Sequence, residues 1–321
     1  MTPEIAASIT AAAEAIAAAD RLAITGHVNP DGDALGSALA LALAARSVGK
    51  EAVVGFGGGS VIPEHYDFLD LTPIVDAADF PDEPDVMVVF DTAVADRLAE
   101  LAGAAARAKT LVVVDHHVTN GGLGDIAIVD PTASASAMLA FRLIEALGWA
   151  IDDSVATALH TGIVTDTGRF QYSSTDGETL RVAAELLDAG VRPEVIGQAM
   201  YESVPFGYLA ASAAVLGRAV LEEELGLVWS VVLRADVAAA GVDPSDLDGL
   251  IDDLRIAREA GVAALVKEVD QGFKVSLRSR GAVDVGSIAA ANGGGGHHNA
   301  AGFTVPGPLA DVLERVRAGL R

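Results

Sequence analysis

The chain has 321 residues, which suits two domains of ordinary size, and it carries 45 acidic against 21 basic residues. The net charge of −24 argues against a protein that holds a long nucleic-acid duplex, since such proteins present a basic surface, so any nucleotide ligand is expected to be small. The lack of cysteine excludes disulfides and thiolate metal sites, and the lack of a membrane-length apolar run or a basic signal region predicts a cytoplasmic protein with no membrane partner.

The first part of the chain alternates strands with helices. Strand-like apolar runs are expected at residues 21–26, 51–55, 85–90, 110–114 and 126–129. Helical patterns are expected at residues 2–19, 34–48, 134–148, 154–164 and 174–190. Strands that alternate with helices predict an α/β domain whose sheet is mostly parallel and covered on both faces.

The second part of the chain has a different order of strands and helices. A helical connection at residues 192–214 is broken at Pro205 and Gly207. Strands are then expected at residues 219–225, 227–234, 262–269 and 273–278, and helices at residues 247–258, 285–292 and 309–320. We therefore expect an N-terminal domain at residues 1–190, a helical linker at 191–217 and a smaller α/β domain at 218–321.

Polar candidates for chemistry come directly after the apolar strands of the first part. His27 follows AITG, Asp91 follows MVVF, and Asp115 with His116 follows LVVV. In open α/β sheets, ligands bind beyond the carboxyl ends of the strands. We therefore expect these side chains to meet at one edge of the sheet.

Further acidic groups extend this set. Asp31 and Asp33 flank Gly32, which permits a tight turn with both carboxylates facing inward, and Asp166 ends an apolar helical run in the segment GIVTDTG. Mixed carboxylate and imidazole ligands suit Mn²⁺, with Mg²⁺, Fe²⁺ or Co²⁺ as alternatives. Two such cations about 3.5–4 Å apart are suited to in-line attack on a phosphate ester. Each motif alone is compatible with an ordinary polar loop or a helix cap, but the complete set favours a metal site.

The motifs together resemble those of the DHH phosphoesterase family with a C-terminal DHHA1 domain. The matching segments are HVNPDGDALGS, VVFDT, VVVDHH, GIVTDTGRFQYSST and GGGGHHNAAGF, in the family's order over nearly the whole chain. They are most similar to the nanoRNase/pAp phosphatase type, which includes relatives that act on cyclic di-AMP or pApA. The resemblance implies hydrolysis of very short oligoribonucleotides to mononucleotides, and of pAp to AMP, by a hydroxide that bridges two metal ions, and it implies a homodimer.

The resemblance also implies roles for individual residues. One metal ion is assigned to His27, Asp31 and Asp91, and the other to Asp33, Asp91, His116 and Asp166, so that Asp91 bridges the two. His117 and Asp115 are assigned to catalysis. His117 would lie near the scissile phosphate as a donor or an acid, and Asp115 would orient a neighbouring ligand.

The second domain carries the residues expected to bind substrate. A tetraglycine at residues 293–296 exposes backbone amides to which a phosphate or base can approach closely, although such a run can equally be a flexible linker. Arginine is suited to phosphate because its fork pairs bidentately with phosphate oxygens. The resemblance assigns six residues of this domain to substrate binding: Arg278, Ser279, Gly294, Gly295, Gly296 and His297.

Two other functions stay open on the sequence. A manganese-dependent inorganic pyrophosphatase shares the DHH metal site, but its second domain would carry a lysine- and arginine-rich motif, whereas this chain has four lysines. A catalytically inactive DHH module that senses a nucleotide is the other alternative. The acidic surface also has an ordinary explanation in solubility alone.

Three residues that are not assigned to the metal or catalytic set receive weaker interpretations. His160 lies on an apolar helical face and is expected to be a buried, hydrogen-bonded core histidine. Arg169 and Phe170 follow Asp166 closely, so a base-stacking or phosphate-binding role stays open for them.

Overall fold

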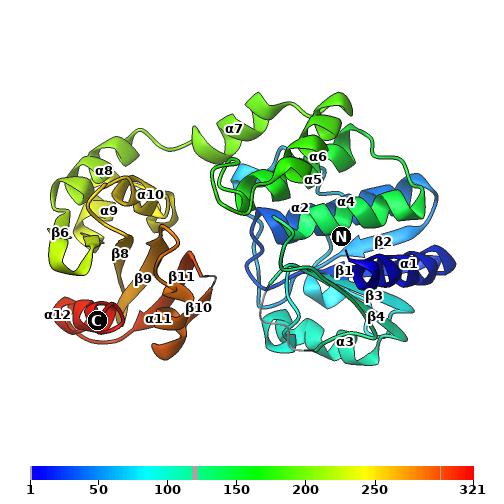
Figure 1. Cartoon of the computed structure of the whole chain (residues 1–321), viewed down its shortest axis with the longest axis horizontal. Coiled ribbons are helices and arrows are strands. Elements are labelled where there is room, and N and C mark those ends of the chain that lie inside the picture. Colours follow the sequence, from blue (N-terminus) through cyan, green and yellow to red (C-terminus); the bar gives the residue numbers. More distant parts are fainter. Residues whose placement is uncertain (1, 118–121, 297) are drawn as a thin grey trace. The chain divides into compact units, whose positions relative to one another are not determined.

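The computed structural model describes residues 2–117, 122–296 and 298–321. The chain forms two compact units, at residues 1–203 and 204–321 (Figure 1). Among the residues that the structure describes, no helix combines the length and apolarity that crossing a bilayer requires.

The sheet of the first unit is parallel throughout and has the strand order β2-β1-β3-β4-β5. Its strands are β1 (Arg21–Thr25), β2 (Glu51–Val54), β3 (Val86–Phe90), β4 (Thr110–Asp115) and β5 (Ile126–Val129). Val88 of β3 lies in register with Ile24 of β1 and Val112 of β4. The predicted parallel α/β sheet is therefore confirmed.

Helices cover both faces of this sheet. The helices of the first unit are α1 (Pro3–Ala18), α2 (Gly32–Ser47), α3 (Ala102–Arg107), α4 (Ser136–Leu147), α5 (Asp153–Asp166), α6 (Gly177–Asp188) and α7 (Pro193–Tyr201), of which α5 packs on α2 and α6 on α5. Val88 and Val112 belong to the core under α2 and α4, whereas Met87 and Val113 belong to a separate core under α3 on the opposite face (Figure 1). Burial on both faces explains why these strands read as continuous apolar runs.

The second unit contains a mixed sheet with the order β10-β11-β9-β8-β7-β6, in which only the β7–β8 pair is parallel. Its strands are β6 (Val220–Glu222), β7 (Leu227–Val232), β8 (Val262–Val269), β9 (Gly272–Ser279), β10 (Gly295–Gly296) and β11 (Ala300–Val305). Its helices are α8 (Gly207–Gly217), α9 (Arg234–Ala240), α10 (Leu250–Arg255), α11 (Val285–Ala291) and α12 (Leu309–Ala318). Separate apolar cores lie on its two faces.

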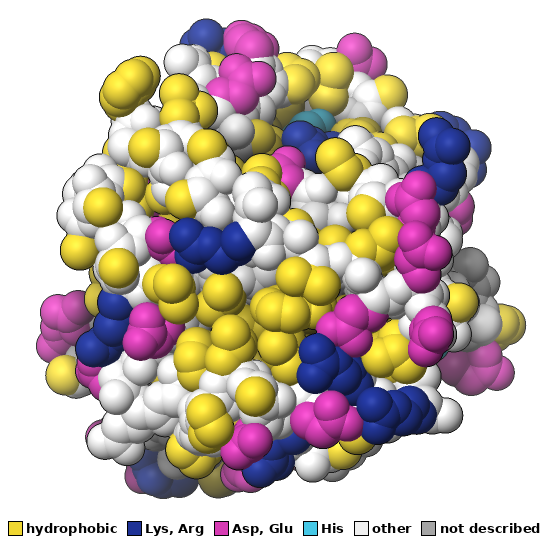
Figure 2. Space-filling view, turned by 90° about the vertical axis from the view of Figure 1, so that its left-hand side faces the viewer, with side chains coloured by type: hydrophobic (Ala, Val, Ile, Leu, Met, Phe, Trp, Pro, Cys, Tyr) yellow, Lys and Arg dark blue, Asp and Glu magenta, His cyan; other side chains and the backbone are white. Residues whose placement is uncertain are grey.

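The acidic and basic side chains of the second unit are interspersed on the face that Figure 2 shows, which carries no continuous basic field. Arg317 pairs with Glu222 at 2.7 Å, and the Arg218 guanidinium pairs with Asp236. Such pairing neutralises the arginines locally. This face therefore lacks the basic footprint of a protein that binds long nucleic acid.

Short helices account for most differences from the sequence prediction. The strand expected at residues 227–234 ends at Val232, and α9 begins at Arg234 because the Asp236 carboxylate accepts a hydrogen bond from the Leu233 backbone N–H at 2.9 Å. Helix α3 was not expected, since its six residues include Gly103 and form no clear amphipathic pattern. The expected helical connection is interrupted as predicted, because Pro205 lies between α7 and α8, although Gly207 is the first residue of α8.

His160 of α5 is 4% exposed, as expected of a core residue, but its Nδ1 has no hydrogen-bond partner among the described residues. Burial lowers the pKa of the His160 imidazole from 6.5 to about 4. The expected burial of His160 is therefore found, whereas its Nδ1 takes no part in the hydrogen bonding that was expected of this side chain.

This histidine predicts an acid-dependent loss of stability. The folded protein keeps His160 neutral down to about pH 4, whereas the unfolded chain protonates it from about pH 6.5, so its contribution is complete above pH 6.5 and is lost as pH falls toward 4. At pH 5 the loss should be about 2 kcal/mol in the free energy of unfolding. Between pH 7.5 and pH 5, urea unfolding should therefore give a change in the free energy of unfolding that is about 2 kcal/mol less favourable in the wild type than in His160→Gln. An equal pH dependence in both proteins would contradict it.

Candidate metal centre and active site

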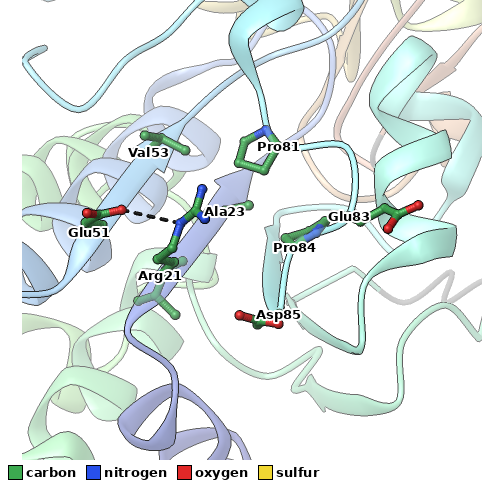
Figure 3. Close-up of a pocket in the computed structure, with 9 residues that line it drawn as sticks. Arg21, Ala23, Glu51, Val53, Pro81, Glu83, Pro84 and Asp85 are labelled. Carbon is green, nitrogen blue, oxygen red and sulfur yellow. Dashed lines mark ion pairs between the residues drawn. The ribbon is translucent and has the colours of Figure 1, made fainter.

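The two edges of the first sheet differ in chemistry. At the amino ends of β1, β2 and β3 lies a small pocket of about 100 Å³, in which Arg21 pairs with Glu51 at 3.3 Å (Figure 3). Asp85, which also lines it, pairs with Lys109 at 2.6 Å. The lining residues include no imidazole. The predicted metal ligands belong to the opposite edge of the sheet, at the carboxyl ends of its strands.

Asp91 stands at the centre of that carboxyl edge. It follows β3 directly, is 2% exposed, and has a left-handed φ of 61°, a strained conformation that often marks functional sites. Its two oxygens face different imidazoles: Oδ2 lies 3.3 Å from His27 Nε2, and Oδ1 lies 3.5 Å from His116 Nε2. This arrangement suits a carboxylate that bridges two cations.

The N-terminus of α2 adds two carboxylates on either side of Asp91. Asp31 is the N-cap of α2, so its Oδ1 accepts hydrogen bonds from the backbone N–H groups of Asp33 and Ala34, while its Oδ2 lies 3.6 Å from His27 Nε2. Asp33 is 1% exposed, and its Oδ2 lies 3.9 Å from His116 Nε2. The start of α2 thus places one carboxylate beside His27 and another beside His116.

The N-terminus of α4 holds Asp33 and Asp91 in place. The Ser136 backbone N–H donates to Asp33 Oδ2 at 2.6 Å, and that of Ala137 donates to Asp33 Oδ1 at 2.8 Å. The Ser136 hydroxyl donates to Asp91 Oδ1 at 2.9 Å. Helix N-termini favour negative charge, so α4 stabilises both carboxylates. Sequence reasoning missed Ser136, for which the only signal is a serine in the first turn of the helix expected at residues 134–148.

Asp166 and the histidine pair complete the cluster. Asp166 ends α5, and its Oδ2 lies 3.4 Å from His116 Nε2. The His117 ring is fixed by Asp115, since its Nδ1 lies 2.6 Å from Asp115 Oδ1 and 3.7 Å from Asp91 Oδ1. Three groups of ligand atoms within 4.8 Å of one another result: His27, Asp31 and Asp91; Asp33, His116 and Asp166; and Asp91, His116 and His117.

Electrostatics in this cluster show crowded negative charge. Burial and the neighbouring Asp91 and Asp166 raise the pKa of Asp33 well above its usual value, and burial raises that of Asp166 to about 7. Burial lowers the pKa of His27, but hydrogen bonds with Asp31 and Asp91 outweigh it and raise that pKa to about 10. In the same way the facing carboxylates raise the pKa of His116 to about 9. Protons therefore occupy places that a divalent cation would fill, and the donor set fits Mn²⁺ or a similar ion.

Close helix packing sets the positions of these ligands. A Cβ on Gly162 of α5 would lie 2.7 Å from Ala137 Cβ and 2.9 Å from Asp33 Oδ1, and a Cβ on Gly36 of α2 would lie 2.3 Å from the Ala158 carbonyl oxygen. Glycine at both positions therefore allows α2, α4 and α5 to approach closely. The approach brings Asp33 next to the N-terminus of α4.

The variant Gly162→Ala should consequently displace Asp33. We expect overpacking to destabilise the fold by about 1–3 kcal/mol and to weaken Mn²⁺ binding about tenfold. Gly197→Ala is the matched control, because a Cβ on this helical glycine of α7 meets nothing within 4 Å. Calorimetric titration with Mn²⁺ would measure the effect, and equal affinities in the two variants would contradict the proposed constraint on Asp33.

In the second unit, the tetraglycine is part of the sheet. Gly295 and Gly296 form β10 and pair with β11, so the segment is not a linker. A Cβ on Gly294 would lie 2.1 Å from the Gly302 carbonyl oxygen, and Gly296 has a φ of 138°, so both positions need glycine for internal reasons. Gly295 alone of these three has open space beside it, and its backbone is exposed.

The remaining substrate-binding candidates differ in accessibility. Arg278 is half-buried, and its Nη1 donates to the Leu277 carbonyl oxygen at 3.2 Å. Ser279 is 2% exposed, and its Oγ accepts a hydrogen bond from the Gly281 backbone N–H at 3.0 Å. His297 lies outside the described residues. Substrate contact by these residues stays a prediction.

Comparison with known proteins assigns the chain to a family. The DHH family N-terminal domain matches residues 21–163, and the DHHA1 domain matches residues 228–320. The bifunctional oligoribonuclease and PAP phosphatase NrnA of Thermus thermophilus is 35% identical over 304 residues, which cover 93% of this chain and 88% of that protein. The chain therefore belongs to the DHH family of phosphoesterases.

Two further likenesses refine this placement. A solved exopolyphosphatase-related protein from Bacteroides fragilis has a TM-score of 0.91 and 25% identity, and the match covers 98% of this chain and 96% of that one. The cyclic-di-AMP phosphodiesterase GdpP of Geobacillus thermodenitrificans is 28% identical over 315 residues, which cover 88% of this chain and 44% of that protein.

Proposed function

We propose that this protein is a metal-dependent phosphoesterase that hydrolyses very short oligoribonucleotides and dinucleotides such as pApA to mononucleotides, and pAp to AMP. The observation that carries the proposal is the position of Asp91, whose two oxygens each face a different histidine at 3.3 and 3.5 Å. The 35% identity to an oligoribonuclease and PAP phosphatase supports the substrate class. The likeness to GdpP supports cyclic di-AMP as a further substrate.

We assign two divalent cations, Mn²⁺ in the first place, to this centre. His27 and Asp31 would hold one of them, and Asp33, His116 and Asp166 the other, with Asp91 shared. Bound there, the cations would lower the pKa of a water molecule and neutralise phosphoryl oxygens. The protein's own contribution is to hold the carboxylates in place through the N-termini of α2 and α4.

His117 is the proposed proton donor to the leaving oxygen. Asp115 accepts hydrogen bonds from the His117 backbone N–H at 3.1 Å and from its ring Nδ1 at 2.6 Å. With Nδ1 paired to Asp115 in this way, Nε2 is the ring nitrogen that we assign to proton exchange with substrate. Asp115 is therefore a positioning residue in this proposal.

The chain is further proposed to work in the cytoplasm as a homodimer formed through its first unit. The acidic charge of −24 agrees with small rather than polymeric nucleotide substrates. Light scattering at micromolar concentration should give about twice the chain mass of 32.6 kDa. A monomer at all concentrations would contradict the dimer proposal and leave the enzymatic one intact.

A substrate panel tests the proposed activity. The protein would be incubated with Mn²⁺ and, separately, pAp, pApA, cyclic di-AMP, a five-nucleotide RNA or pyrophosphate, and AMP or phosphate release would be measured. Turnover of pApA, pAp or short RNA is expected. Turnover of pyrophosphate alone would instead indicate a pyrophosphatase, and nucleotide binding without any turnover would indicate a sensor.

A further inference from the structure

A second cavity of the first unit is lined by residues of α5, α6 and α7 and takes no part in the chemistry described above. Its volume of about 460 Å³ is within the range of small-molecule sites. Its walls are mostly apolar, with Phe170 and Leu187 among them, and none of the proposed metal ligands lines it. The cavity is therefore separate from the cation centre, although the loop that closes it begins directly after Asp166.

One buried polar group in the wall points to a ligand. The His160 side chain lines this cavity, is 4% exposed, and leaves its Nδ1 without a hydrogen-bond partner in the described part of the chain. The same burial keeps the imidazole neutral at pH 7, since its pKa is lowered to about 4. A neutral imidazole offers one donor and one acceptor, and a half-turn of the ring exchanges their positions. A ligand with a polar ring atom would satisfy this group.

A cationic group at the same cavity adds a second requirement. The Arg169 guanidinium lines it and lies 4.8 Å from the centre of the Tyr201 ring, a stacking contact that holds the cation in place. Within the described ranges, no carboxylate forms an ion pair with Arg169, which is exposed. Arg169 and Phe170 both have a φ of 62°, so the loop presents them in a defined, unusual conformation. The guanidinium is thus available to an anion.

We infer that this cavity binds a small aromatic anion, with nucleoside monophosphates as the class that fits best. The ring would lie against Phe170 and the aliphatic walls, a polar ring atom would pair with His160, and the phosphate would pair with Arg169. A fatty acid would leave the imidazole unpaired, and a neutral aromatic ligand would leave the guanidinium unpaired. The choice of a nucleotide rests on the proposed function, whose product is a nucleoside monophosphate.

Binding of AMP to the full chain in excess EDTA tests this inference, because no cation then supports binding at the metal centre. Gly197 of α7 lines the cavity, and a Cβ there meets nothing within 4 Å, so we expect the side chain of Gly197→Leu to occupy part of the cavity. Gly217→Leu is the matched control, since Gly217 ends α8 with equally open space. Calorimetry should show AMP affinity at least tenfold weaker in Gly197→Leu and unchanged in Gly217→Leu.

Two partial ligands and one further variant test the assigned contacts. Adenosine lacks the anion and ribose 5-phosphate lacks the ring, so each should bind at least tenfold more weakly than AMP. His160→Phe should weaken AMP binding about three- to tenfold, the usual effect of losing one hydrogen bond. No AMP binding by the wild type, or equal affinity in Gly197→Leu, would overturn the inference. Loss of self-association in Gly197→Leu without a change in AMP affinity would identify a protein interface instead.

The test of AMP binding can fail or succeed independently of the test of the proposed activity. Hydrolysis of pApA with Mn²⁺ is measured on the same wild-type protein, and its absence would refute the proposed activity whatever the AMP titration shows. If the wild type hydrolyses pApA, but Gly197→Leu binds AMP in EDTA as tightly as the wild type does, the proposed activity stands and the second site is refuted.

Discussion

Replacing Asp91 with asparagine is expected to lower kcat for pApA hydrolysis by about three orders of magnitude or more. Asparagine keeps the shape but removes the negative charge and one of the two oxygens that face His27 and His116. Loss of charge stabilisation worth about 4 kcal/mol corresponds to this factor. Calorimetry should show loss of high-affinity Mn²⁺ binding in the same variant.

The fold should survive this substitution, which separates a chemical effect from unfolding. Asparagine tolerates the left-handed φ of 61° at this position. Asp91 raises the pKa of Asp33 by repulsion but raises that of His27 by hydrogen bonding, so its neutralisation removes effects of both signs from the metal-free protein. We therefore expect the Tm of Asp91→Asn in EDTA to stay within a few degrees of the wild type.

Asp130→Asn is the matched control for this experiment. Asp130 follows β5 at the same carboxyl edge and is 4% exposed, but it pairs with Thr132 and Arg142 and belongs to none of the three ligand groups. Its activity should stay within a few-fold of wild type. Activity of Asp91→Asn within tenfold of wild type at saturating Mn²⁺ would refute the bridging role.

The meeting of these side chains could be predicted because it depends on topology. His27, Asp91 and Asp115 each follow an apolar strand, and parallel strands place their carboxyl ends at one edge. Val88 and Met87 enter different cores because successive side chains of a strand point to opposite faces of the sheet, and helices cover both faces. Both features can be predicted from the order of strands and helices alone, without knowledge of how the helices pack.

Other parts of the site could not be predicted because they depend on contacts between distant segments. Ser136 donates to Asp91 across 45 positions of the chain, and only the close approach of α2, α4 and α5 at Gly162 brings it there. The unpartnered Nδ1 of His160 was likewise invisible, since an apolar helical face predicts burial but not the absence of a partner. The cavity beside His160 is lined by three helices, and no local sequence pattern predicts how those helices pack against one another.

Replacing Asp115 with asparagine is expected to lower kcat by about two orders of magnitude while Mn²⁺ affinity stays within a few-fold of wild type. The carboxylate is fully buried and accepts from His117 Nδ1 at 2.6 Å, which sets the tautomer of that imidazole. Asparagine removes the negative charge that accepts the Nδ1 proton and that would balance the charge on the ring as Nε2 donates to the leaving oxygen. A buried Asp-to-Asn change beside a catalytic histidine lowers kcat by up to about 10⁴ in serine proteases. Steady-state kinetics and calorimetric Mn²⁺ titration measure the two quantities.

The double variant with His117→Ala decides whether Asp115 acts through His117. If it does, His117→Ala alone should lower kcat by at least as much as Asp115→Asn, and adding the second change should lower it no further, because the histidine that Asp115 orients is already gone. If instead Asp115 supports the β4 end independently, the two losses should multiply. Retained Mn²⁺ affinity in all three variants would locate the effect in proton transfer, whereas a parallel loss of Mn²⁺ would place His117 in the metal centre through its 3.7 Å contact with Asp91.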